Sequence, residues 1–428
     1  MMGAIGILGM LVLLLLRVPV ALALMASALL TYGWIVNPDA ALARFGQDAY
    51  RDAANSALII VPMFVLMGML LANSGLGADV FRALDRFLWR LRGGLSMATV
   101  GASAVFGAVN GSAIAGATTM SLVAVPEMRA AGYNRGFSGG VTAAGSTLGM
   151  LIPPSSLLVL YGLLTSAPIG QILIAAVIPG VIATAALMLT AYLMVRRNPE
   201  LAPSIGDKPA ISKRRAVLQV WPVPVIFGVS MGGLYGGFFA PSEAGAVGAF
   251  LALAYGVLSR RLTWSTFAGA LSRTVRISAM VFLLVIAGKM FGYFLAVSRL
   301  PASLGRWVGE LDMAPIVILL AIFVIYFVLG ALMDETAILV IMTPIALPIV
   351  LALGYDAVWF GVVSIMMLLT GLICPPVGVL VFVVSGVTKI PLGEIYRGIW
   401  PFAAAQSLCV VLVFLVPSIA TYALRYMG

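Results

Sequence analysis

Glycine and proline positions in the first half of the chain recur in the second half at a nearly constant spacing. The spacing is 222 or 223 residues, as between Pro153-Pro154 and Pro375-Pro376. The other matched positions are Pro19 with Pro241, Gly107 with Gly330, Pro126 with Pro348, Gly132-Tyr133 with Gly354-Tyr355, Gly170 with Gly393, and Pro179 with Pro401. Because glycine and proline govern where a backbone turns or breaks, this agreement predicts two halves of related architecture.

Between these positions the chain consists of apolar runs whose length suits a lipid bilayer. Hydrophobic residues make up 62% of the chain and charged residues only 9%, against about 25% charged in an average soluble domain. A spanning helix needs about 20 mostly apolar residues, which leaves room for about ten to twelve such elements. We therefore expect an all-α polytopic membrane protein, with the lipid bilayer as part of its solvent.

The polar composition argues against several other classes of protein. The chain has no histidine and only two cysteines, Cys374 and Cys409, both within apolar runs. Metal centres and histidine-based catalysis are therefore poor interpretations, and we expect neither an enzyme nor an organic cofactor. The net charge of +10 comes from basic residues in short loops, where they set membrane orientation, so we expect no nucleic-acid partner.

We expect the matched halves to form two repeats, each with about five spans and one re-entrant hairpin. In each half, one apolar stretch is interrupted midway, which predicts a hairpin, and the next contains Pro-Pro, which predicts a broken helix. The expected divisions are a first repeat at 1–195, with its hairpin at about 95–128 and its broken helix at about 137–165; a cytoplasmic linker at 196–219; and a second repeat at 220–428, with its hairpin at about 312–350 and its broken helix at about 357–387.

Charges in the connecting segments predict that the two repeats have inverted topology. The segment 37–54 carries two arginines and three aspartates, whereas its counterpart 260–276 carries four arginines and no acid. Because cytoplasmic loops are enriched in Lys and Arg, we expect 37–54 outside and 260–276 in the cytoplasm. Both termini would then lie outside, with Arg17 at the cytoplasmic end of the first helix. The first hairpin would enter from the cytoplasm and the second from the periplasm.

Inverted repeats with broken helices are typical of secondary transporters, whose sites lie near the membrane midplane between the repeats. Irregular backbone at membrane depth should line a protein cavity, because exposed polar backbone is costly in lipid. The sequence has four such breaks, at Asn110–Ser112, Gly149–Ser155, Met333–Thr336 and Gly371–Gly378.

The residues around these breaks resemble a known family, the M subunit of tripartite (TRAP-type) transporters, over almost the whole chain. The likeness is carried by the run from Gly107 to Gly162, GAVNGSAIAGATTMSLVAVPEMRAAGYNRGFSGGVTAAGSTLGMLIPPSSLLVLYG, and by the later runs CPPVGV and PLGEIYRGIWPF. One departure is the first hairpin tip, which reads Asn110-Gly111-Ser112-Ala113 where the resemblance leads us to expect a Gly-Ser-Ser-type tip.

The resemblance implies an elevator-type importer of the ion-transporter superfamily in the bacterial inner membrane, with a scaffold domain and a transport domain. It implies Na⁺ as the coupling ion and carboxylates as substrates, such as C4-dicarboxylates, keto acids, sugar acids or sialic acid. The implied partners are a small membrane subunit (Q) that forms a Q–M complex and a periplasmic substrate-binding protein (P).

The breaks supply candidate ligands for the implied sodium. Sodium is a hard cation that prefers oxygen, and broken helices offer backbone carbonyls beside side-chain hydroxyls. We expect each hairpin tip to form a sodium site with the broken helix of its own repeat. The candidates are Asn110, Gly111, Ser112, Gly149, Pro153 and Ser155 in the first repeat, and Asp334, Thr336, Gly371, Pro375 and Gly378 in the second.

The substrate carboxylate would meet the positive N-terminal ends of the half-helices. The candidates for this contact are Ser112, Ser155, Ser156, Glu335 and Thr336.

Other interpretations of these residues stay open. Glycine and proline can simply kink packed helices, and Ser112 can cap one. The acids Asp334 and Glu335 can be functional within the membrane or solvated at a periplasmic surface. Lys289 can pair with an acid, bind an anion or extend along its stem to an interface, and Glu243 suits a helix start.

Two other functions compete with the first. A binding-protein-independent or proton-coupled organic-anion transporter is compatible with intramembrane acids, although the oxygen-rich tips favour sodium. An enzyme or a structural scaffold is a weaker alternative, because the sequence contains no evident nucleophile–base pair or metal-ligand set.

Overall fold

The computed structural model describes residues 2–203, 212–310 and 313–426, and every regular element among them is a helix. Eight helical stretches in this part of the chain are long and apolar enough to cross a membrane, or nine if the bent pair α8 and α9 counts as one span. The expected all-α membrane protein is confirmed.

In the first half, the chain folds into eleven α-helices. They are α1 (Met2–Leu15), α2 (Val20–Ile35), α3 (Pro38–Ala53), α4 (Ile60–Asn73), α5 (Leu76–Leu88), α6 (Gly94–Asn110), α7 (Ala113–Ala130), α8 (Arg135–Leu151), α9 (Ser156–Thr165), α10 (Ile169–Ala175) and α11 (Val177–Arg197).

In the second half, eleven further α-helices are described. They are α12 (Lys213–Val220), α13 (Pro222–Tyr235), α14 (Pro241–Leu258), α15 (Trp264–Val297), α16 (Leu300–Glu310), α17 (Pro315–Leu332), α18 (Glu335–Ala352), α19 (Ala357–Gly371), α20 (Val379–Thr388), α21 (Leu392–Leu415) and α22 (Ser418–Thr421).

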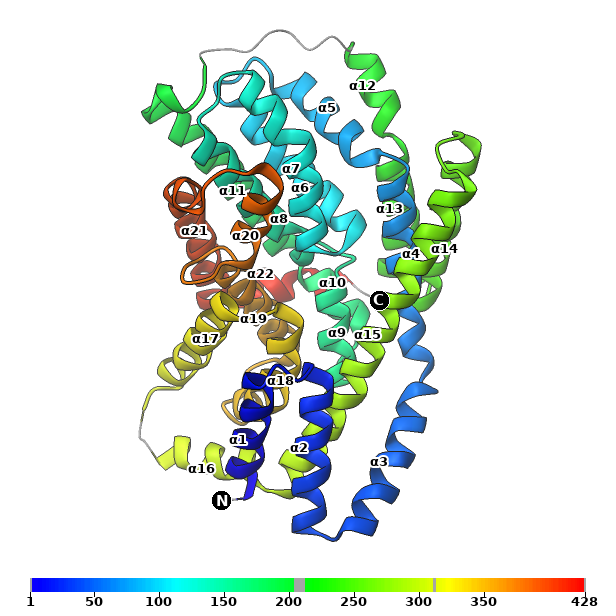
Figure 1. Ribbon diagram of the computed structural model, residues 1–428, viewed down its shortest axis with the longest axis vertical. Helices are drawn as coiled ribbons and strands as arrows, with labels where there is room; N and C mark the ends of the chain where they lie inside the picture. Colours follow the sequence, from blue (N-terminus) through cyan, green and yellow to red (C-terminus); the bar gives the residue numbers. More distant parts are fainter. Residues whose placement is uncertain (1, 204–211, 311–312, 427–428) are drawn as a thin grey trace.

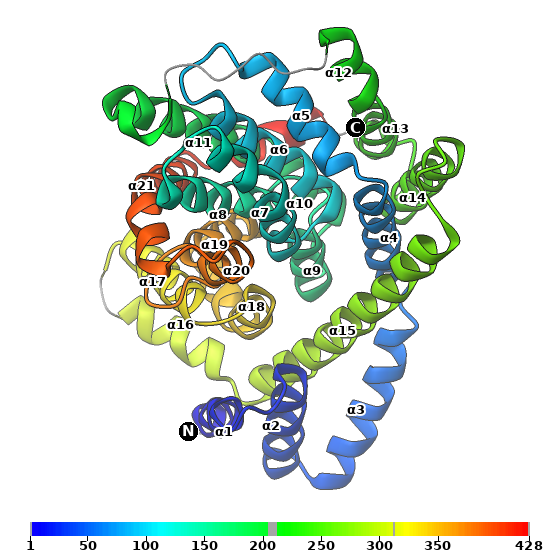
Figure 2. The same cartoon turned by 45° about the horizontal axis from the view of Figure 1, so that its top comes forward.

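The helices form two groups that lie side by side (Figures 1 and 2). The outer helices are α1–α4 and α13–α15, in which α4 packs against α14 and α15, and α15 packs against α2. The hairpin helices are α6–α11 and α17–α21, in which α6, α7 and α21 pack against α8, and α17 packs against α19. The chain passes from the first group to the second through α5 and again through α16 (Figure 1).

The interruptions expected from glycine, proline and polar residues are present. The break at Arg17–Pro19 separates α1 from α2, and the tip between α6 and α7 is Gly111–Ser112. The prolines of Pro153-Pro154 stand between α8 and α9, whose axes differ by 41°. Both Pro-Pro bonds, at 153–154 and at 375–376, are cis, so the two breaks share the same backbone feature.

Three polar segments expected to be connections turn out to be largely helical. Asn37 caps α3 by accepting a hydrogen bond from the Ala40 amide at 2.6 Å, so most of 37–54 is helix. Thr263 caps α15 in the same way, and the polar residues of 260–276 extend that helix to 34 residues. The expected linker 196–219 contains α12, while its residues 204–211 lie outside the described residues.

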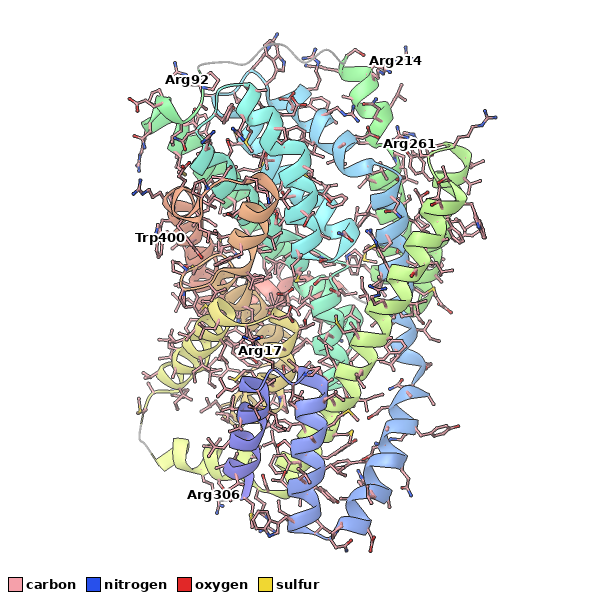
Figure 3. All side chains as sticks on the ribbon, viewed as in Figure 1. Arg17, Arg92, Arg214, Arg261, Arg306 and Trp400 are labelled. Carbon is pink, nitrogen blue, oxygen red and sulfur yellow. The ribbon has the colours of Figure 1, made fainter. Side chains whose placement is uncertain are left out.

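Basic side chains gather at one end of the molecule. Arg92, Arg214 and Arg261 lie toward the top of Figure 3, Arg306 lies at the bottom, and Arg17 lies at the tip between α1 and α2. At the top, the buried carboxylate of Asp79 on α5 forms ion pairs with Arg82, at 2.9 Å, and with Arg261. The pair with Arg82 lies within α5, whereas the pair with Arg261 ties α5 to the connection between α14 and α15.

Candidate functional site

The first hairpin tip lies directly against the first broken helix. The Ser156 hydroxyl donates a hydrogen bond to the Gly111 carbonyl at 2.6 Å. Near the ends of α6 and α8, a Cβ added to Gly107 would lie 2.2 Å from the Cα of Gly149. Since real side-chain atoms do not approach that closely, the two glycines let the helix ends meet. The structure thus brings the tip at Gly111 against the break at Pro154 and Ser156, and Gly149 against α6.

Asn110 gives this junction an oxygen without a partner. Its side chain is 7% exposed, and its Oδ1 atom accepts no hydrogen bond from the described residues. A buried polar atom without a partner costs roughly 1–3 kcal/mol, so such atoms in native proteins commonly face a ligand, an ion or water. A hard cation that prefers oxygen ligands fits this position.

The serine hydroxyls at the junction also begin helices. Ser112 Oγ accepts a hydrogen bond from the Ala115 amide, and Ser155 Oγ accepts one from the Leu158 amide, both at 3.3 Å. Ser155 also donates to the Met150 carbonyl. A hydroxyl oxygen has two lone pairs, so capping uses only part of the acceptor capacity of each serine. The capping role expected as an alternative for Ser112 is therefore present.

The second hairpin meets the second broken helix in a corresponding way. The Ala331 carbonyl accepts hydrogen bonds from the amides of Val377 and Gly378, each at 3.3 Å. A Cβ added to Gly371 would lie 2.8 Å from the Gly330 carbonyl carbon, so these helix ends also meet through glycine. Gly378 has a φ of +57°, a left-handed conformation that glycine adopts without strain.

The two acids of the second tip have different surroundings. Asp334 is exposed, and its Oδ1 atom accepts hydrogen bonds from the Thr336 hydroxyl and from the amides of Thr336 and Ala337, at 3.0 and 3.3 Å. It is an ordinary helix cap for α18. Glu335 is only 2% exposed, and its Oε2 atom has no hydrogen-bond partner among the described residues. The buried acid of this tip is therefore Glu335.

A polar cavity between the two helix groups was not foreseen as a site. It has a volume of about 750 Å³ and is lined by outer-helix residues Arg51, Asp52, Ala54, Asn55, Ser56, Gly288, Lys289, Gly292 and Tyr293, and by hairpin-helix residues Leu164, Ser166 and Pro344. Lys289 Nζ lies 3.0 Å from Asp52 Oδ1, which confirms the expected possibility that Lys289 pairs with an acid. The only sequence signal was a lysine in the middle of an apolar run.

Glu243, at the start of α14, has a structural role. Glu243 Oε2 accepts a hydrogen bond from the Ala240 amide at 2.8 Å, so the expectation of a helix-start acid is confirmed. Cys374 and Cys409 are free and buried. In the part of the chain that the structure describes, no group of three or more His, Cys, Asp or Glu side chains could hold a metal ion.

Comparisons with known proteins agree on one family. The family model described as "Tripartite ATP-independent periplasmic transporter, DctM component" matches residues 7–419. The sialic acid TRAP transporter large permease protein SiaM of Vibrio cholerae is 33% identical, over 85% of this chain and 85% of its own length. The isethionate TRAP transporter permease protein DctMQ of Oleidesulfovibrio alaskensis is 31% identical, over 95% of this chain but 64% of its own length.

The fold has a counterpart among solved structures. The crystal structure of the Alcanivorax borkumensis YdaH transporter matches with a TM-score of 0.63 and 16% identity, over 89% of each chain. At this identity the likeness concerns the fold alone. The family model and the permease relatives identify the chain as a multi-pass inner-membrane protein that belongs to the DctM-component family of tripartite ATP-independent periplasmic transporters.

Proposed function

We propose that this chain imports organic acids by sodium-coupled, elevator-type alternating access, after receiving them from a periplasmic binding protein. The observation that carries the proposal is the pair of junctions between hairpin tips and broken helices, one of which contains the unpartnered Asn110 oxygen. Secondary transporters commonly bind Na⁺ through the free backbone carbonyls at the ends of such half-helices, together with nearby side-chain oxygens. The two repeats, with the expected divisions and inverted orientation, are part of this proposal.

The two helix groups suit the roles of a fixed and a moving part. The outer helices would act as the scaffold domain, and the hairpin helices would carry the tips, the breaks and the bound ions as the transport domain. Helices α5 and α16 connect the groups at two places in the chain, so they would accommodate the displacement. The contact between α4 and the end of α6, where Gly68 lies against Val109 and Asn110, is where the moving part would slide.

The substrate class follows from the relatives and from the site. SiaM is named for sialic acid and DctMQ for isethionate, so both relatives are named for organic acids. We propose a carboxylate such as a C4-dicarboxylate, a keto acid or a sugar acid, bound by the helix starts at Ser112, Ser155, Ser156 and Thr336. The partners proposed are a small membrane subunit (Q) in a Q–M complex and the binding protein (P).

One observation favours a second candidate, in which protons replace sodium. Glu335 is a buried acid without a hydrogen-bond partner among the described residues, and such an acid at membrane depth is a candidate proton carrier. In that case Glu335→Gln would abolish the pH dependence of uptake, whereas sodium coupling predicts that uptake by this variant still follows the sodium gradient.

The test is uptake into proteoliposomes that contain this chain with its small subunit. A panel of labelled carboxylates is presented with and without the cognate binding protein, and with either an inward sodium gradient or an inward proton gradient. The proposal expects uptake of at least one acid that requires both sodium and the binding protein. Uptake driven by protons alone would replace it with the second candidate, and uptake indifferent to the binding protein would contradict the role of that partner.

A further inference from the structure

The cavity between the outer helices and the hairpin helices holds more basic than acidic groups. On α3, the carboxylate of Asp48 lies 2.6 Å from Arg44 Nε and 3.2 Å from a terminal nitrogen of Arg51. Asp52 in turn pairs with Lys289. Three cationic side chains thus share two carboxylates, so the cluster carries a net charge of +1, with Arg51, Lys289 and Asp52 lining the cavity itself.

The cations that line the cavity keep donors for a ligand. Lys289 has three N–H donors and, among the described residues, a hydrogen bond only to Asp52. Arg51 donates one hydrogen bond to the Tyr293 hydroxyl at 2.9 Å, and its side chain is 64% exposed. The Arg44 guanidinium lies over the Tyr293 ring, 4.9 Å from its centre, which fixes the ring that Arg51 contacts. An arginine fork and a lysine at one concave surface suit a carboxylate or sulfonate group.

The cavity is distinct from the site at the first hairpin tip. Among the hairpin helices it contacts the C-terminal end of α9, at Leu164 and Ser166, whereas the first break lies at the N-terminal end of that helix. The ten residues of α9 separate the two by ~15 Å, at 1.5 Å of rise per residue. A second cavity of about 380 Å³ shares Asn55, Ser56, Ser166 and Lys289 with the first and continues along α9 at Gly162.

We propose that this cavity is a receiving site, where an organic anion binds Arg51 and Lys289 of the outer helices before it reaches the hairpin tips. The inference rests on the proposed function for the identity of the anion, and it places the binding step on the fixed part of the protein. The loop charges predict that 37–54 lies on the outer side of the membrane, and in that orientation the cavity faces the compartment that holds the binding protein. The hairpin-helix wall of the cavity moves in an elevator cycle, so the site would release its anion when that wall is displaced.

The inference is tested by the charge preference of a cysteine placed in the cavity. Ser56 lines both cavities, is exposed and has no hydrogen bond through its side chain among the described contacts, so Ser56→Cys is a small change. The variant is reacted, in its complex with the small subunit, with the anionic reagent sulfonatoethyl methanethiosulfonate and with its cationic trimethylammonium analogue. Each rate is divided by the rate with a free thiol, and the protein without the new cysteine gives the background from buried Cys374 and Cys409.

We expect the anionic reagent to be favoured by at least about tenfold, the lower end of the enrichment that a cleft of one charge sign produces. Lys289→Gln and Arg51→Gln should each remove most of this preference. Arg51 is mostly exposed, so its variant keeps the test valid if Lys289→Gln fails to fold around Asp52. Lys389→Gln, which removes the same charge at the exposed end of α20, is the matched control and should leave the preference unchanged.

A purely structural ion pair would give a different result. In that case Lys289→Gln would lower thermal stability and leave the ratio of the two labelling rates unchanged, and this outcome overturns the inference. The experiments distinguish a failure of the receiving site from a failure of the transport function. If uptake of a carboxylate is sodium-driven but the labelling of Ser56→Cys shows no anion preference, only the receiving site is refuted. If the labelling shows an anion preference but no acid is taken up, the transport function is refuted and the anion site is kept.

Discussion

Gly68, in the middle of α4, lies directly against the residues that lead into the first hairpin tip. A Cβ added there would lie 2.3 Å from the Val109 carbonyl oxygen and 3.0 Å from the Cα of Asn110. Both atoms belong to the backbone, so neither can rotate away, and overpacking of this kind costs about 1–3 kcal/mol. Gly68→Ala should therefore disfavour the described arrangement of the tip by about 5- to 150-fold relative to any arrangement in which the tip has moved.

The carrier must return to this arrangement in every cycle, so we expect the rate of uptake into proteoliposomes to fall within that range. The effect of alanine on helix propensity cancels, because α4 is helical in both arrangements. Gly228→Ala on α13 is the matched control, since its Cβ would meet nothing within 4 Å, and it should transport normally. Equal uptake by the two variants, at equal amounts of inserted protein, would refute the sliding contact between α4 and the tip.

Three further predictions concern the ion site and the end of the molecule that carries the basic residues. Asn110→Ala should raise the sodium concentration for half-maximal uptake by about tenfold, since it removes one oxygen ligand worth roughly 1–3 kcal/mol. Asn110→Asp keeps an oxygen and should raise this concentration less. An unchanged sodium dependence in Asn110→Ala would remove Asn110 from the site. Ser112→Ala should lower the melting temperature by the loss of a cap worth about 1 kcal/mol, and a loss of uptake at a temperature where the protein remains folded would add an ion or substrate role. Burial and the nearby Glu127 carboxylate raise the pKa of Asp85 on α5 to about 6, so the charged form is disfavoured in the folded state and the stability of the fold falls as pH rises from the unfolded pKa toward 6. Asp85→Asn should therefore raise the melting temperature more at pH 7.5 than at pH 4.5. An equal rise at both pH values would contradict this.

The breaks could be predicted from the sequence because their cause is local. Pro153-Pro154 and Pro375-Pro376 cannot continue a helix, and the polar tip at Asn110–Ser112 interrupts an apolar run that is too short to span twice. By contrast, the helices in the polar segments 37–54 and 260–276 were not predicted from the sequence, which marked both segments as connections. Their helices are amphipathic or continue a neighbouring span, so hydropathy alone marks them as connections although the backbone is helical.

The roles of individual side chains depended on contacts that the sequence does not contain. Asp334 is a candidate ligand by its place at the tip, and since aspartate is also a good helix cap, only the structure shows that one of its carboxylate oxygens caps α18. Asp52 and Lys289 are 237 residues apart, so a lysine within an apolar run indicated that a partner exists but not which acid it is. The cavity beside this pair arises from the packing of two helix groups, which no local pattern describes.

The most direct test of the account is the simultaneous flux of ²²Na⁺ and a ¹⁴C-labelled carboxylate into the same proteoliposomes. These contain the chain with its small subunit, and the binding protein is loaded with an acid selected from the uptake panel. The account predicts that ²²Na⁺ enters only when the loaded binding protein is present, in a fixed ratio to the acid, and that Asn110→Ala lowers both fluxes together. Carboxylate uptake without accompanying ²²Na⁺ entry would contradict sodium coupling.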